Sequence, residues 1–117
     1  MKYALLIHDD EAAWAAMSEE DRNQLLKEYG EFSNDVVERG LMRGGEQLQP
    51  SSAATTVRIR DDKTITADGP FAETREQLGG FYLIECENLD QAIETASRIP
   101  STRVGGIIEV RPVVERG

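Results

Sequence analysis

Residues 68–85 read DGPFAETREQLGGFYLIE, and they set the architecture of this chain. The segment starts with an acidic turn, continues through a polar loop and enters an apolar strand by a Gly-Gly step. Gly69 can adopt backbone angles that other residues avoid, and Pro70 fixes its own φ at about −65°. We therefore expect a stiff turn that holds the Asp68 carboxylate, although Asp-Gly-Pro is also common in turns for backbone reasons alone.

Outside this segment, hydrophobic periodicity predicts an alternation of strands and helices. Ser18 is a typical helix cap and Gly40 a typical helix end, and Asn88 and Pro100 bracket a second helix in the same way. A hairpin of strands 55–60 and 64–67 is expected around Asp61-Asp62-Lys63, whereas residues 9–17 read as an acidic, alanine-rich connection. The remaining predicted strands are residues 2–7, 41–48, 80–86 and 107–114.

This order of elements, β-α-β, an inserted hairpin and β-α-β, predicts an α+β fold over a single domain, residues 1–117. It is the ferredoxin-like split β-α-β arrangement, an antiparallel sheet with two helices on one face. The first strand is apolar on both faces, with Leu5 and Ile7 on one and Ala4 and Leu6 on the other. Because two helices cover only one face, we expect a second copy of the sheet to cover the other, which makes the protein a homodimer.

The amino-acid composition and net charge limit the kinds of molecule that this protein is expected to bind. The chain has 117 residues, one cysteine and a formal net charge of −9. Such a charge repels nucleic-acid phosphates and anionic lipids, so we expect neither nucleic acid nor membrane as a partner. The lone Cys86 and the absence of a recognisable signal peptide favour a cytoplasmic protein. Neither Gly44-Gly45 nor Gly79-Gly80 has the context of a phosphate loop, and no organic cofactor is expected.

The predicted topology also indicates where a site would lie. The ends of the first two strands, His8-Asp9-Asp10 and Glu46-Gln47, should meet the beginnings of the last two at one edge of the sheet. We predict that this edge binds a small molecule, with Trp14 and Phe71 contributing apolar surface. Trp14, Phe71 and Tyr82 are equally compatible with a core position. The expected ligand-binding residues are Asp10, Trp14, Glu46, Gly69, Pro70 and Phe71.

The sequence resembles the YCII-related family, specifically the branch named after its Asp-Gly-Pro-Phe motif. The matching segments are residues 1–7, 44–48, 68–85 and 109–112. The resemblance implies a ferredoxin-like protomer that pairs into a dimeric α/β barrel. It also implies a suspected enzyme with a histidine and an aspartate facing a cleft, and a rival regulatory role beside extracytoplasmic-function sigma factors. The aspartate corresponds to Asp68. The first helix carries Lys27-Glu28-Tyr29-Gly30 where relatives often have the histidine, and the sole histidine here is His8.

His8 and Asp68 are thus the candidate catalytic pair, in which the carboxylate would orient the imidazole for general acid/base chemistry. The plainer alternative is a hydrogen-bonded, inert histidine at the end of a strand. Asp9, Asp10 and Glu46 with this pair could instead hold a divalent cation, but no HxH or Cys spacing supports a metal site and none is predicted. Two functions remain: an acid/base enzyme acting on a small molecule, and a non-catalytic binding or regulatory protein.

Overall fold

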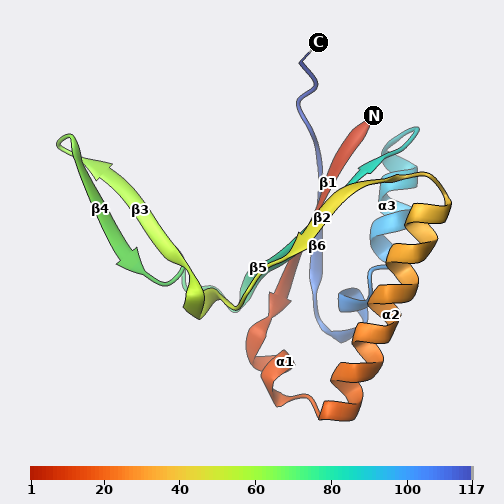
Figure 1. Ribbon diagram of the computed structural model, residues 1–117, viewed down its shortest axis with the longest axis horizontal. Coiled ribbons are helices and arrows are strands. Elements are labelled where there is room, and N and C mark those ends of the chain that lie inside the picture. Colours follow the sequence, from red (N-terminus) through yellow and green to blue (C-terminus); the bar gives the residue numbers. More distant parts are fainter. Residues whose placement is uncertain (117) are drawn as a thin grey trace.

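The computed structural model describes residues 1–116 and contains two sheets and three α-helices (Figure 1). The four-stranded sheet has the order β2-β5-β1-β6, and β3 and β4 form a separate two-stranded sheet. In chain order the elements are β1 (Lys2–Asp10), α1 (Glu11–Ala16), α2 (Glu19–Glu38), β2 (Met42–Gln47), the 3-10 helix η1 (Ser51–Ala53), β3 (Thr55–Arg60), β4 (Lys63–Asp68), β5 (Glu76–Glu85), α3 (Leu89–Ser97), the 3-10 helix η2 (Pro100–Val104) and β6 (Ile107–Pro112).

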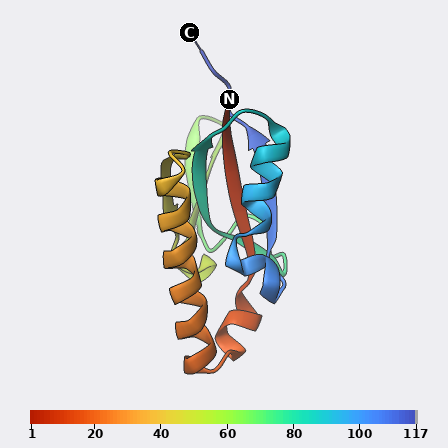
Figure 2. The ribbon, with the colours of Figure 1, turned by 90° about the vertical axis from the view of Figure 1, so that its right-hand side faces the viewer.

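Every pairing in the larger sheet is antiparallel. β1 pairs with both β5 and β6, and β2 pairs with the other side of β5. β1 and β2 therefore run in one direction and β5 and β6 in the other, while α2 and α3 cover the same face of the sheet (Figure 2). This is the ferredoxin-like α+β arrangement, as the order of elements predicted.

The helices α2 and α3 begin where the sequence predicts. The Ser18 side chain accepts a hydrogen bond from the Asp21 backbone N–H at 3.0 Å, and Asn88 caps α3 by accepting from Gln91 N–H at 2.9 Å. Gly40, with φ of +75°, follows the end of α2, because this left-handed conformation is costly for other residues. Both predicted caps are confirmed.

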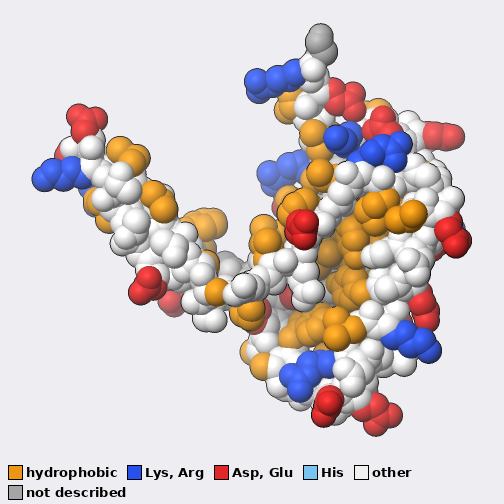
Figure 3. Space-filling model, in the orientation of Figure 1, with side chains coloured by type: hydrophobic (Ala, Val, Ile, Leu, Met, Phe, Trp, Pro, Cys, Tyr) orange, Lys and Arg blue, Asp and Glu red, His pale blue; other side chains and the backbone are white. Residues whose placement is uncertain are grey.

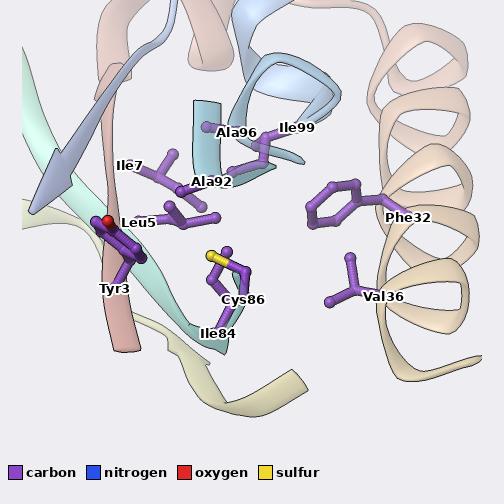
Figure 4. Close-up of a cluster of buried hydrophobic side chains, with 10 residues drawn as sticks. All are labelled: Tyr3, Leu5, Ile7, Phe32, Val36, Ile84, Cys86, Ala92, Ala96 and Ile99. Carbon is purple, nitrogen blue, oxygen red and sulfur yellow. The ribbon is translucent and has the colours of Figure 1, made fainter. Parts of the chain in front are cut away.

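One hydrophobic core lies between the sheet and the two long helices (Figure 4). Tyr3, Leu5 and Ile7 point into it from β1, because alternate residues of a strand share a face. Phe32 and Val36, one turn apart on α2, meet them from the helix layer. The alternate residues of β1, among them Leu6, remain only partly buried on the opposite face.

Several predicted boundaries were wrong, and β1 continues to Asp10 instead of ending at residue 7. Residues 9–17 are not a plain connection, since α1 forms there: the Asp10 side chain accepts from Ala13 N–H at 3.1 Å and starts an alanine-rich turn. β5 begins at Glu76 rather than at residue 80, because Glu76 and Gln77 pair with the end of β1. β6 ends at Pro112, before residue 114.

The hairpin of β3 and β4 projects from the rest of the molecule on the side of the sheet away from the helices (Figure 1). Asp61 and Asp62, both with positive φ, form its two-residue turn, as a tight hairpin requires, so that Lys63 belongs to β4. Val57 and Ile59 are 60% and 68% exposed. The predicted hairpin is present, but its apolar side chains are not covered by the rest of this chain.

Candidate functional site

Four chain segments meet at the predicted edge of the sheet. Asp10 at the end of β1 pairs with Glu76 at the start of β5, and His8 pairs with Ile107 at the start of β6. Gln47, at the end of β2, pairs with Gly80. The antiparallel topology therefore assembles at one edge residues that are far apart in sequence.

A cleft of about 280 Å³ opens at this edge, between the sheet, α1 and α2. Its wall includes Ile7 and Asp9 from β1, Trp14 from α1, Leu26 and Tyr29 from α2, and Tyr82 from β5. Apolar side chains gather in the band between α2 and the sheet in the space-filling view (Figure 3). The cleft is thus mainly apolar with a few polar groups, which is the usual composition of a small-ligand site.

Asp9 is the most unusual of these polar groups. Burial raises the pKa of its carboxyl group above the ordinary value of 3.8, and nearby Glu11 adds to the rise. The Ser101 hydroxyl, the Trp14 indole and the charge of His8 lower the pKa in part. Its Oδ1 atom is buried and has no hydrogen-bond partner within residues 1–116. Asp9 is thus a partly buried carboxyl group in the wall of a mainly apolar cleft, the kind of polar group that orients a ligand.

A break in strand pairing makes room for this carboxylate. Ile7 pairs with Gly80 but His8 pairs with Leu78, so Gly79 is an extra residue in β5. A Cβ atom on Gly79 would lie 2.7 Å from Asp9 Oδ2, closer than such contacts allow. Gly79, the first residue of the Gly-Gly step, therefore leaves the space that the Asp9 side chain occupies.

Tyr29 and Ser101 form a hydrogen-bonded pair beside Asp9. The Tyr29 Oη and Ser101 Oγ atoms are bonded, although Ser101 comes from η2 at the far end of the chain. Burial, with a smaller contribution from the Asp9 charge, raises the pKa of Tyr29 to about 12. The phenol therefore stays protonated at neutral pH and keeps a hydrogen to donate.

Tyr82 supplies a rigid part of the wall. Its Oη lies 3.1 Å from Ser33 Oγ, and its ring meets that of Phe32 edge to face at a centroid distance of 5.3 Å. Burial raises the pKa of Tyr82 as well, so it too is a neutral phenol at physiological pH. A ring fixed at both its edge and its hydroxyl presents a constant surface to a ligand.

Only some of the predicted ligand-binding residues at this edge line the cleft. Trp14 and Glu46 line the cleft. Asp10 instead caps α1, and its Oδ2 lies 3.8 Å from Arg75 Nε. The Nε2 atom of His8 lies 3.5 Å from Glu109 Oε1 on β6, and His8 does not line the cleft.

The Asp-Gly-Pro-Phe motif lies at the base of the projecting hairpin. Gly69 has a φ of +94°, as predicted for a conformation that favours glycine. Its N–H donates to Ala54 O at 2.7 Å and its carbonyl accepts from Thr56 Oγ1 at 2.8 Å, so the turn is firmly held. Phe71 is 81% exposed, and Asp68 to Phe71 are not part of the cleft wall. The pairing of His8 with Asp68 stays a prediction.

Sequence reasoning missed Tyr29 and Ser101 and considered Asp9 only as a metal ligand. Tyr29 lies four residues after Leu25, at the helical spacing of the apolar face of α2, so its hydroxyl gives no separate signal, and Ser101 gives none beyond following a proline. Asp9 continues the inward alternation of Leu5 and Ile7, and this alternation was the available clue. A carboxylate at the next inward position of a buried strand indicates a polar group that faces the interior or a cleft.

Across residues 1–116, no group of three or more His, Cys, Asp and Glu side chains has an arrangement suited to a metal ion. Of the helices in the same range, none has the length and apolar character to cross a membrane.

Comparison with known proteins places this architecture in a family. The family model described as the YCII-related domain matches residues 1–116. A curated protein from Rhizobium meliloti (strain 1021) is 41% identical over 117 residues, covering 97% of this chain and 92% of its own length, and is described as uncharacterized.

Proposed function

The chain belongs to the YCII-related family, and from this premise we propose that it binds a small molecule in the cleft formed by β1, β5, α1 and α2. The observation that carries the proposal is Asp9, a half-buried carboxyl group with a raised pKa in the wall of a mainly apolar cleft. Perturbed carboxyl groups in clefts are concentrated at binding and catalytic sites.

The same groups suit acid/base chemistry on the bound molecule. A carboxyl group with a raised pKa exchanges protons closer to neutral pH, which is what a general acid or base requires. Tyr29, protonated and bonded to Ser101, would position the substrate through its hydroxyl. In this proposal Asp9 is the proton-transferring group, and proton transfer within a small molecule is the reaction class.

We also propose that the functional unit is a cytoplasmic homodimer. The face of the sheet opposite the helices carries partly exposed apolar residues such as Leu6 and Leu83, and the hairpin beside it exposes Val57 and Ile59. A two-stranded hairpin is only marginally stable by itself, so a neighbouring surface would stabilise it. Sedimentation at micromolar concentration tests the dimer, and a monomer there would contradict it.

A non-catalytic regulatory role, linked to an extracytoplasmic-function sigma factor system, is the second candidate. The position of His8 favours it, because the imidazole lies next to Glu109 and outside the cleft wall. In that case the cleft would bind an effector without converting it.

A metabolite library tests the first proposal. Trp14 is the single tryptophan and lines the cleft, so a true ligand should raise the melting temperature and also change the Trp14 emission. Conversion of the hit, followed by NMR, separates an enzyme from a binding protein. If no compound of a broad library changes either signal, the cleft is not a ligand site.

A further inference from the structure

The charged side chains of the cleft wall are all acidic. Asp9 contributes a carboxyl group to its wall, and among the described residues that form this wall none is Lys, Arg or His. An anionic ligand would find no positive partner in this wall and would meet the like charge of Asp9, in surroundings where partial burial strengthens electrostatic interactions. Small carboxylates and phosphates are therefore poor candidates.

The aromatic content of the wall points in the same direction. Trp14, Tyr29 and Tyr82 line the cleft from three different elements, α1, α2 and β5. Aromatic rings attract cations through their quadrupoles, and the attraction grows when the cation is withdrawn from water. Rings around a carboxyl group are the combination used to bind ammonium groups.

The position of Asp9 in the wall indicates where the charge of the ligand would lie. Asp9 lines the cleft at the inward-facing position after Leu5 and Ile7, and a carboxylate is an acceptor when ionised. We propose that the cleft binds a small organic amine, whose ammonium group donates to Asp9 and whose apolar body lies against the aromatic wall. This inference rests on the proposed function, since it names the ligand class of the same cleft.

Three matched probes test the amine: 2-phenylethylamine, 2-phenylethanol and 3-phenylpropanoate, which share a phenyl ring and differ in the charge of the end group. Binding is measured at pH 7.5 and low salt by Trp14 emission, excited where the phenyl ring does not absorb. We expect the amine to bind at least about tenfold more tightly than the alcohol, because a charge-assisted hydrogen bond to a carboxylate is stronger than a neutral one. The carboxylate should bind more weakly than the alcohol.

Variants assign the preference to Asp9. Asp9→Asn should bring the affinities of amine and alcohol to within about twofold of each other, because the charge is lost and the shape is kept. Asp62→Asn is the matched control: it removes the same charge from an exposed turn with φ of +62°, which Asn tolerates, and should keep the full preference.

The possible failures are distinguishable. If 3-phenylpropanoate binds as tightly as the amine, or if the amine preference survives in Asp9→Asn, the amine inference is wrong while the cleft remains a ligand site. If none of the three probes binds but a library compound does, the amine inference again fails alone. If neither probes nor library compounds bind, the proposed function fails as well.

Discussion

Gly106→Ala is the most direct test of how the cleft is supported. A Cβ atom at this position would lie 2.7 Å from Ser101 Cβ and 2.8 Å from Ser101 O. Ordinary contacts between carbon atoms are at about 3.5–4.0 Å, so Ser101 would have to move by several tenths of an ångström or more. Ser101 is fully buried, and its carbonyl accepts the Gly106 N–H at 2.8 Å, so no flexible side chain can absorb the change.

We expect Gly106→Ala to cost about 1–3 kcal/mol in the free energy of unfolding, the usual range for overpacking a close-fitted site. For a chain of this size the melting temperature should fall by roughly 4–12 °C. The loss should extend to the cleft, because a displaced Ser101 no longer holds Tyr29. It also no longer lowers the pKa of Asp9, which should therefore rise further.

Calorimetry measures the stability, and carbon NMR of the Asp9 carboxyl group measures the pKa. Gly44→Ala is the control, since its Cβ would meet Leu83 Cδ1 at an ordinary 3.6 Å. Equal melting temperatures for the two variants would refute the view that Ser101 is rigidly held. A normal melting temperature with an altered Asp9 pKa would confine the effect to the cleft and contradict the predicted stability loss.

Three further predictions concern single residues. Because the pKa of Asp9 is raised in the folded protein above its unfolded value of 3.8, folding stability falls as pH rises through the folded pKa. Asp9→Asn should accordingly raise the melting temperature at pH 7, and this gain should vanish below about pH 3.8 in a series of thermal scans. Gly69→Val should cost about 1–3 kcal/mol, since Gly69 has a φ of +94°, whereas Ala67→Val in the exposed strand should be nearly neutral; equal urea midpoints would show an unstrained turn. Gly30→Ala should stabilise α2 by about 0.5–1 kcal/mol, because a Cβ there meets nothing within 4 Å, and a lower urea midpoint would exclude this.

Much of the fold could be predicted because its signals are local. Ser18 and Asn88 cap their own helices, and the stripe containing Leu25, Phe32 and Val36 has the helical period. The order of these elements then leaves few topologies to choose from. The short helix α1 escaped prediction because six residues offer less than two turns of periodicity.

The cleft could be predicted only in outline. The topology predicted which strand ends meet at this edge of the sheet. The polar cluster in the cleft depends on Asp9, Tyr29 and Ser101, which meet only after folding. The Asp-Gly-Pro-Phe motif drew attention to Asp68 through its rigid turn, and that turn is present. A rigid turn does not say which surface it faces, and this one lies at the hairpin base, outside the cleft wall.

The central position of β1 has a consequence for how the protein is made. β1 ends at Asp10, but both of its neighbours, β5 and β6, lie beyond residue 75. At translation rates of roughly 5–20 residues per second, synthesis of the intervening segment takes on the order of 3–13 seconds. Throughout this interval the nascent chain exposes Tyr3, Leu5 and Ile7 without a strand to pair with. The ribosome-bound chain should therefore be a client for chaperones that hold short apolar segments until β5 emerges.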